Sequence, residues 1–252
     1  MQTIAVYDSQ SREYHRAFQV FLDHTDQKVK AQKWLNDLVG ALPSRRVFVD
    51  AGAGNGKVTA WFTGRFERTI AIEPNASLRT ELRRACPAAD IIPERILDAE
   101  VGAIGDLILC SHVLYYIDAT EWMPNLERLV SWLSSDGVLV LAVQNHETDC
   151  MRMLEHFLGR RFELASLARR FEGERGGSYE VHIETVPAHI ETPDLDAAYM
   201  IAEFMLNLLP MPAPPARGAL EEYVRTHFER AKDSFRFSCD QDFAHIRRRD
   251  KR

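Results

Sequence analysis

The stretch Val47-Phe48-Val49-Asp50-Ala51-Gly52-Ala53-Gly54-Asn55-Gly56-Lys57 decides the fold of this chain. Its first half is an apolar, β-branched run that stops at Asp50, and such a run is typical of a buried strand. Glycines then occupy positions 52, 54 and 56. Glycines that follow a strand let backbone N–H groups approach a ligand closely. The segment therefore predicts a ligand-binding turn at the carboxyl end of a strand.

Two common phosphate-binding motifs do not fit this turn. A P-loop needs Gly, four residues, Gly-Lys and then Ser or Thr, but Ala51 and Val58 stand where the first glycine and the hydroxyl belong. The dinucleotide fingerprint Gly-x-Gly-x-x-Gly also fails, because Lys57 or Thr59 occupies the place of its last glycine in the two possible registers. The turn is therefore built for a different ligand.

The pattern that fits is acidic-x-Gly-x-Gly-x-Gly, beginning at Asp50. An acid ahead of the turn repels a pyrophosphate but suits a ligand that carries a positive ammonium group and no phosphate, such as S-adenosylmethionine. Glu73 ends the next strand-like run, where we expect its carboxylate to accept hydrogen bonds from two ribose hydroxyls. A tight turn without a ligand is the alternative, and the position of Glu73 disfavours it.

Strands and helices alternate on both sides of this turn. Apolar runs typical of strands occur at 46–50, 69–72, 90–92, 106–110 and 138–143. Helical spacing of apolar residues occurs between them at 58–66, 76–85 and 122–133. This order implies right-handed crossovers and a parallel sheet with helices on both faces.

The two ends of the chain add further elements. Apolar spacing between Tyr14 and Leu42 predicts two helices with a break at Thr25-Asp26. Towards the carboxyl terminus we expect helices at 154–171, 195–209 and 220–232 and strands at 179–186 and 235–246. We expect a single domain over 1–252, in which 1–42 form a helical lid, 43–175 the cofactor-binding core and 176–252 strands with a substrate-covering helix.

At this point the sequence resembles the class I S-adenosylmethionine-dependent methyltransferases. The residues that carry the resemblance are Asp50–Gly56, Ile72-Glu73-Pro74, Asp106–His112 and Asp136-Gly137. The resemblance implies an α/β, Rossmann-like, seven-stranded sheet with helices on both faces, an antiparallel last strand and an N-terminal helical lid. It also implies S-adenosyl-L-methionine as cofactor, with S-adenosyl-L-homocysteine as product.

The stretches Tyr14–Thr25, Glu73-Pro74, Leu114–Asp118 and Phe235-Arg236-Phe237 are similar to the histamine N-methyltransferase branch. That branch holds its cationic amine with a glutamate, but Gln27 stands at the nearest match, and His112 replaces a glutamine of the branch. A neutral heteroaromatic ring is therefore favoured as substrate. In size and layout the chain is also similar to azapteridine N-methyltransferases of the toxoflavin pathway.

Candidate site residues follow from the strand ends and from the resemblance. The expected cofactor contacts are Asp50, Gly52, Gly54, Asn55, Glu73, Pro74, Arg95, Ile96 and Ser111. The expected substrate contacts are Tyr7, Tyr14, Phe18, His112, Tyr115, Tyr116 and Asn145, with hydrogen bonds also offered by Gln144 and His146. His112 is the expected catalytic residue, because a histidine titrates near neutrality and is able to accept a proton or orient a ring nitrogen.

Methyl transfer from a sulfonium is an in-line displacement on an already activated reagent, so the protein supplies mainly proximity and alignment. We expect no metal site and no covalent nucleophile. The expected activity is methylation of a ring nitrogen in a small planar heteroaromatic. The alternatives are a small-molecule O-methyltransferase, a histamine-like amine N-methyltransferase and a non-catalytic S-adenosylmethionine-binding protein.

Composition excludes several other classes. The 252 residues carry a net charge of −6, which argues against nucleic-acid partners because a phosphate backbone needs a basic surface. The 4 cysteines contain no CxxC pair, so neither a disulfide scaffold nor a structural zinc site is expected. No apolar run approaches the length of a membrane span and no secretion signal is visible. We therefore expect a cytoplasmic protein without a membrane partner, as a monomer or weak dimer.

Overall fold

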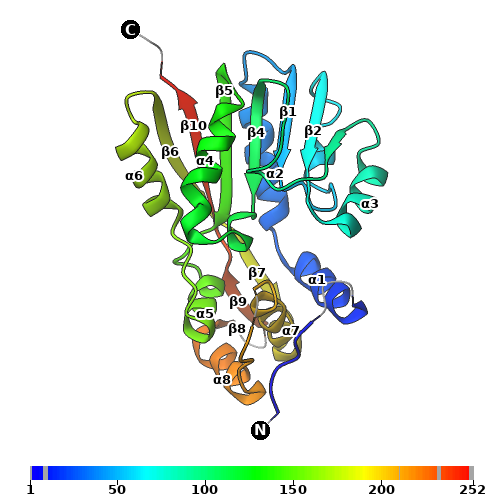
Figure 1. The fold of residues 1–252 in the computed structure, drawn as a ribbon. Helices are drawn as coiled ribbons and strands as arrows, with labels where there is room; N and C mark the ends of the chain where they lie inside the picture. The colour runs from blue at the N-terminus through cyan, green and yellow to red at the C-terminus, as the bar shows by residue number, and fades with distance from the viewer. Residues whose placement is uncertain (1, 8–10, 210, 232–233, 250–252) are drawn as a thin grey trace. The chain divides into compact units, whose positions relative to one another are not determined.

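The computed structural model describes residues 2–7, 11–209, 211–231 and 234–249 (Figure 1). Two compact units divide the chain. The first unit comprises Met1–Ala31, Gln144–Glu163 and Thr185–Gln241, and the second comprises Gln32–Val143, Leu164–Glu184 and Asp242–Arg252. These boundaries differ from the divisions at residues 42 and 175 expected from the sequence, and the single-domain organisation stays a prediction.

A seven-stranded sheet forms the centre of the second unit. Its strands are β1 (Val47–Ala51), β2 (Arg68–Ile72), β3 (Asp90–Ile92), β4 (Gly105–Ser111), β5 (Leu133–Gln144), β6 (Tyr179–Val186) and β10 (Gln241–Arg248). They follow the order β3-β2-β1-β4-β5-β10-β6. The strands β1, β2, β3, β4 and β5 are parallel to one another, whereas β10 is antiparallel. The predicted Rossmann-like sheet with an antiparallel last strand is confirmed.

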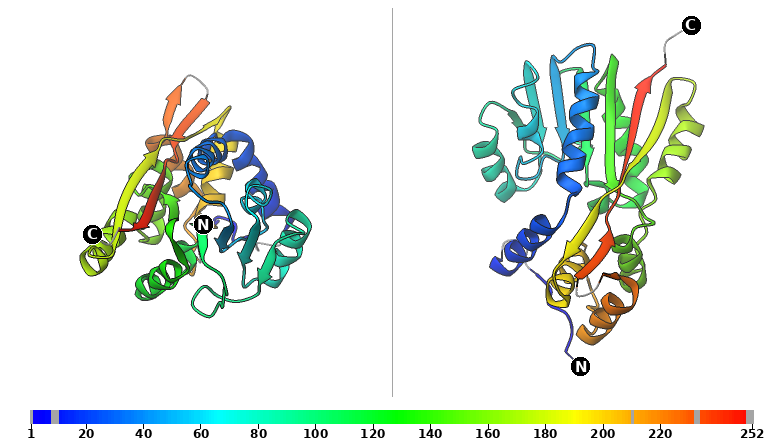
Figure 2. Two further views of the ribbon diagram at one scale, coloured as in Figure 1. Left: turned by 90° about the horizontal axis from the view of Figure 1, so that it is seen from above. Right: turned by 180° about the vertical axis from the view of Figure 1, so that it is seen from behind.

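Helices cover both faces of this sheet. They are α2 (Gln27–Gly40), α3 (Ala76–Ala85), α4 (Trp122–Ser131) and α6 (Leu164–Arg175). The apolar sides of α4 and α6 share one buried cluster with the strands, represented by Leu126, Phe171 and Ile108. The helix α2 lies on the opposite face, as the view from behind in Figure 2 shows, with Leu35 and Val39 buried. The central strands are therefore apolar on both sides, which explains their continuous hydrophobic runs.

The predicted helix at 58–66 is wrong. The structure has only one 3-10 turn there, Thr59–Trp61, among other turns. Tertiary contacts decide this segment, because the Thr59 hydroxyl donates to the buried Asp50 carboxylate at 2.6 Å. The rings of Phe62 and Phe66 pack on Phe48, with centroids at 5.6 and 5.5 Å. Consequently no regular α-helix begins directly behind the glycine turn.

The first unit contains the helices α1 (Arg12–His24), α5 (Asp149–Leu158), α7 (Leu195–Leu206) and α8 (Arg217–His227). Its antiparallel sheet has the order β7-β9-β8, with strands β7 (His189–Thr192), β8 (Glu229–Ala231) and β9 (Ser234–Ser238). The strands β7 and β8 have no counterpart among the predicted elements. The two N-terminal helices and their break at Thr25-Asp26 are confirmed, whereas their role as a lid stays a prediction.

The expected strand at 235–246 is two strands, β9 and β10, that belong to different sheets. The backbone leaves the first sheet at Cys239-Asp240, where Cys239 N donates to Ala188 O at 2.9 Å. The Asp240 carboxylate also accepts a hydrogen bond from Ala188 N, at 2.8 Å. Similarly, the expected helix at 154–171 is interrupted between α5 and α6, after the left-handed Gly159.

Candidate functional site

The glycine turn adopts a backbone conformation that requires glycine. Gly52 and Gly54 have φ angles of 89° and 55°, in the left-handed region that side chains with a Cβ rarely occupy. The N–H groups of Gly52 and Ala53 both donate to Ile72 O, at 2.9 and 3.0 Å. These bonds join the turn to the end of β2, so that two strand ends meet at one place in the second unit.

Glu73 lies next to this turn and is held by it. The residue is 6% exposed. Its Oε2 accepts a hydrogen bond from Gly54 N and its Oε1 accepts one from Asn75 N, each at 2.8 Å. A carboxylate has about four acceptor positions, so each oxygen keeps the capacity to accept one more donor. The carboxylate is therefore fixed in orientation and fits a ligand that presents two hydroxyl groups, as a ribose does.

Arg79 is a residue of this site that sequence reasoning missed. Its Nη1 donates to the carbonyl oxygens of Glu73 and Pro74, at 3.0 and 2.6 Å. The Asn75 side chain caps α3 by accepting from Ser77 N and Leu78 N. Arg79 and the cap thus hold the backbone that carries Glu73. The only sequence signal is that Arg79 lies one helical turn beyond the cap.

Asp50 is buried, with 2% of its surface exposed. The pKa of its carboxyl is raised from 3.8 to about 7, mainly by burial. The hydrogen bond from Thr59 acts against this shift, and the charge of Glu73 adds to it. Because the side chain is bonded to Thr59 in the interior, its first role in the structure is to fix the segment after the glycine turn. A direct contact between Asp50 and a cofactor stays a prediction.

The raised pKa of Asp50 makes stability depend on pH. Between pH 4 and pH 7 the native state binds a proton that the unfolded state has released, so this contribution to the free energy of unfolding decreases as pH rises. Asp50→Asn removes the titration. For each unit by which the pH rises in this range, we expect the free energy of unfolding of the wild type to fall by up to about 1 kcal/mol relative to that of Asp50→Asn. Urea unfolding at pH 5, 6 and 7 measures it, and a difference independent of pH contradicts the assignment.

His112 follows β4 in an unusual conformation. Its φ is 58°, and it is the only non-glycine residue with a positive φ among the described residues. Its N–H donates to Ala142 O at 2.7 Å, which extends the pairing of β4 with β5 to this residue. A histidine in the left-handed region is uncommon, and such residues cluster at functional sites. The backbone thus directs the His112 side chain away from the regular alternation of the strand.

The two tyrosines after His112 have different environments. The Tyr115 ring lies 5.8 Å from the His112 ring and packs against the buried apolar cluster of the second unit. Tyr116 is 66% exposed. Trp122 holds the short 3-10 turn Leu114–Tyr116 in place, since its Nε1 donates to Leu114 O and Ile117 O. Ser111, the last residue of β4, pairs with Ala142 of β5.

Arg95 and Ile96 follow β3 in the second unit. The Arg95 side chain forms an ion pair with Glu121 at 2.6 Å, and its carbonyl accepts from Asp98 N and Ala99 N at 3.0 Å. Ile96 is buried. The side chains therefore stabilise the loop, and a contact of Arg95 or Ile96 with a cofactor stays a prediction.

The remaining candidates belong to the first unit. Tyr14 and Phe18 pack on Phe204 of α7, with ring centroids at 5.4 and 5.6 Å, so these rings have a structural role in α1. The Tyr7 hydroxyl donates to Glu203, which also accepts hydrogen bonds from Tyr199 and from Ala5 N. The buried Glu203 thus fastens the N-terminal segment to α7, which no sequence pattern predicted.

Asn145 and Gln27 form hydrogen bonds with backbone groups of the first unit. Asn145 N donates to Asp240 O and its Oδ1 accepts from Glu147 N, both at 2.8 Å. Gln27, which stands where the histamine-related branch has its amine-binding glutamate, is 4% exposed, and its amide donates to Cys239 O at 2.8 Å. No group of His, Cys, Asp and Glu side chains in the described part of the chain is arranged to hold a metal.

The chain was compared with known proteins. Residues 22–180 match the family described as methyltransferase domain, and no curated protein sequence matches. Among solved structures, a protein from Bacillus halodurans has a TM-score of 0.62 at 10% identity, covering 86% of this chain and 97% of that chain. The YcgJ protein from Bacillus subtilis has a TM-score of 0.58 at 12% identity, covering 85% and 98%.

The N-methyltransferase NodS from Bradyrhizobium japonicum, solved with S-adenosyl-L-homocysteine, has a TM-score of 0.56 at 14% identity, covering 96% of this chain and 100% of that chain. Identities this low show a shared fold alone. The family match spans more than half of the sequence, including the glycine turn, Glu73 and His112. The chain therefore belongs to the methyltransferase-domain family.

Proposed function

We propose that this protein transfers a methyl group from S-adenosylmethionine to a nitrogen of a small, planar heteroaromatic substrate. The observation that carries the proposal is the buried Glu73 carboxylate, anchored to the glycine turn through Gly54 and suited to a ribose. Membership of the methyltransferase-domain family supports the reaction class. The S-adenosyl-L-homocysteine bound to NodS supports the cofactor.

Several groups of the second unit are proposed to hold the cofactor. Glu73 accepts the ribose hydroxyls, and Pro74 and Arg79 keep its backbone in place. The glycine turn with Asp50, Gly52 and Asn55 offers its backbone, and backbone atoms of Arg95, Ile96 and Ser111 serve the adenine. When bound, the cofactor supplies a methyl group on a positively charged sulfur that needs no further activation. The remaining task of the protein is to align the acceptor and exclude water.

His112 is the proposed catalytic residue. Its left-handed backbone is anchored to Ala142 by a 2.7 Å hydrogen bond, so the imidazole is presented at the carboxyl end of β4. Ligands of open α/β sheets bind at this end of the strands. There the imidazole orients a ring nitrogen or accepts a proton from the attacking atom. The other substrate contacts expected from the sequence stay predictions, namely Tyr7, Tyr14, Phe18, Tyr115, Tyr116 and Asn145.

The experiment that tests the proposed function is a mass-spectrometric screen with methyl-labelled cofactor. The acceptor panel consists of azapteridines, other nitrogen heteroaromatics, catechols and histamine. We expect label on a ring nitrogen of a heteroaromatic. Label only on oxygen supports the O-methyltransferase, and label only on histamine supports the amine N-methyltransferase. Cofactor binding without any labelled product favours the non-catalytic binding protein.

His112→Asn is expected to lower turnover about ten- to a hundredfold while the affinity for S-adenosyl-L-homocysteine stays within twofold of the wild type. Asparagine tolerates a positive φ, so the backbone conformation is kept, but its amide does not accept a proton. Steady-state kinetics with an acceptor from the screen, together with calorimetry, measure the two effects. His182→Asn, which makes the same exchange at an exposed histidine of β6, is the matched control. Wild-type turnover in His112→Asn removes this residue from the mechanism.

The structure adds one finding on membranes and leaves other expectations open. None of the helices in the described residues has the length and apolar composition needed to cross a bilayer. A cytoplasmic location, a monomeric or weakly dimeric state and the absence of nucleic-acid partners stay predictions.

A further inference from the structure

Two histidines face each other across the strands β10 and β6, at one edge of the seven-stranded sheet. Arg249 N, directly after β10, donates to Ser178 O, directly before β6, at 2.9 Å. The antiparallel register that this bond sets places His245 of β10 opposite His182 of β6. Their ring centroids are 4.8 Å apart, with an angle of 82° between the ring planes. The two imidazoles are therefore cross-strand neighbours within the second unit.

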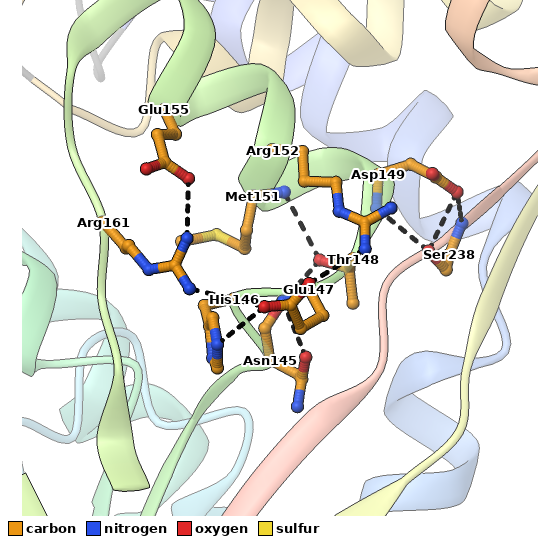
Figure 3. A network of polar contacts seen from close by, with 10 residues as sticks. All are labelled: Asn145, His146, Glu147, Thr148, Asp149, Met151, Arg152, Glu155, Arg161 and Ser238. Carbon is orange, nitrogen blue, oxygen red and sulfur yellow. Dashed lines mark hydrogen bonds and ion pairs between the residues drawn. The ribbon is translucent and has the colours of Figure 1, made fainter. Parts of the chain in front are cut away.

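A histidine of the first unit has a different kind of partner, as Figure 3 shows. His146 Nε2 lies 3.0 Å from Glu147 Oε1, and Arg152 and Arg161 hold that carboxylate at 2.9 and 3.3 Å. A proton added to His146 would therefore face an acid. The ring opposite His245 belongs to another base, so a proton added there would face a group that is itself able to become positive.

The surroundings of His245 also make a positive charge on its ring unfavourable. The residue is partly buried, and its Nε2 is fully buried without a hydrogen-bond partner among the described residues. The ring of Trp34, from α2, lies edge-on to it, with centroids 6.0 Å apart. In an imidazolium both nitrogens carry a hydrogen, so protonation would leave a buried, charged donor unpaired. The folded sheet therefore favours the neutral ring.

The charges near the ring change this preference only in part. Burial is the largest effect, and it lowers the pKa of His245 from 6.5. The positive charges of His182 and Arg247 lower this pKa further, whereas Glu180 and Glu184 of β6 raise it. A chain in which this ring is exposed to water binds the proton more readily than the folded sheet does. The contribution of His245 to stability is therefore present above about pH 6.5 and is lost as the pH falls.

The sheet offers a local way to expose this ring. The strand β6 ends the order of the seven strands, and β10 is the strand with which it pairs. Separation of β6 from β10 would bring His245 Nε2 into contact with water and would leave the pairing of the other six strands intact. Such local opening has a lower free energy than global unfolding.

We propose that the histidine pair, His182 and His245, is an acid-sensitive switch that keeps the edge strand β6 paired with β10 at neutral pH and releases it when the pair takes up a proton. In the closed state His245 is neutral and buried, and in the open state its ring is solvated and carries the proton. Each unit by which the pH falls below 6.5 shifts this equilibrium towards the open state by up to about tenfold. The switch is independent of the proposed methyl transfer, because it involves neither the glycine turn nor His112.

The test is amide hydrogen exchange of the full-length protein at pH 7.5, 6 and 5, with rates corrected for intrinsic exchange. We expect the opening equilibrium constant of the β6 amides to increase up to about thirtyfold between pH 7.5 and pH 5. The central strands β1 and β4 are expected to keep their protection, since the contribution of Asp50 to stability has the opposite pH dependence. Unchanged protection of β6, or an equal loss in β1 and β4, overturns the proposal.

Variants assign the response to the histidine pair. His245→Phe keeps a ring but has no nitrogen to protonate, so the β6 opening constant is expected to agree within twofold at pH 7.5 and pH 5. His182→Gln removes the opposing base at an exposed position and is expected to reduce the acid response to an intermediate value. His156→Phe, at an exposed histidine of α5, is the matched control and is expected to keep the full response. A full acid response of β6 in either variant of the pair contradicts the proposal.

Discussion

Replacing Glu73 by alanine is expected to lower the affinity for S-adenosyl-L-homocysteine by a factor of about 10² to 10⁴. The wild-type carboxylate offers two charge-assisted hydrogen bonds to the ribose, each contributing roughly 1.5–3 kcal/mol. The substitution also removes the acceptors of Gly54 N and Asn75 N, which hold the turn in its conformation. Isothermal titration calorimetry with purified protein measures the loss directly.

Two controls show whether the loss comes from the carboxylate. Glu81→Ala removes an exposed glutamate from α3 and is expected to leave the affinity unchanged. Glu73→Gln keeps the shape and one acceptor oxygen, so it is expected to fall between the wild type and Glu73→Ala. A folded Glu73→Ala protein that binds within threefold of the wild-type affinity refutes the ribose role.

Gly52→Ala is expected to lower the free energy of unfolding by about 2–6 kcal/mol and to remove cofactor binding under conditions where the wild type is folded. An added Cβ would lie 2.3 Å from Val113 Cγ2, so the backbone or the β4 end must move. The φ of 89° adds the cost of a left-handed conformation for a side chain with a Cβ. Urea unfolding followed by circular dichroism measures the change.

The neighbouring glycine provides a matched control. Gly54 also has a positive φ, but an added Cβ would meet nothing within 4 Å, so Gly54→Ala is expected to cost only about 1 kcal/mol. Adding Val113→Ala to Gly52→Ala removes both Cγ atoms and is expected to restore part of the stability. Equal losses in the two glycine variants, with no recovery in the double variant, are inconsistent with the close approach between Gly52 and Val113.

Local sequence patterns were sufficient to predict the parallel strands of the sheet and the glycine turn. Each parallel strand is an apolar run because both faces of the sheet are covered, and that run is visible without any knowledge of its partners. The spacing of Gly52, Gly54 and Gly56 and the acid at position 73 are local too. The expectation that Glu73 lies beside the turn agrees with its 2.8 Å hydrogen bond from Gly54 N. Its role towards a ribose awaits experiment.

The predictions failed where distant residues decide the conformation. The segment 58–66 has helical spacing, but Thr59 bonds to Asp50 and Phe62 and Phe66 pack on Phe48, which favours turns over a helix. The apolar alternation at 235–246 is the same on both sides of Cys239, so only the bonds to Ala188 reveal that the chain changes sheets there.

Residue types and their order along the chain establish the strand–helix alternation, the glycine turn and the family, because these depend on periodicities of a few residues. Only the folded structure assigns His112 its positive φ and Asp50 its raised pKa. Each of these properties arises from burial or from partners supplied by the three-dimensional arrangement. A spacing pattern contains no information on how much water reaches a carboxyl group or on which distant backbone group a residue pairs with.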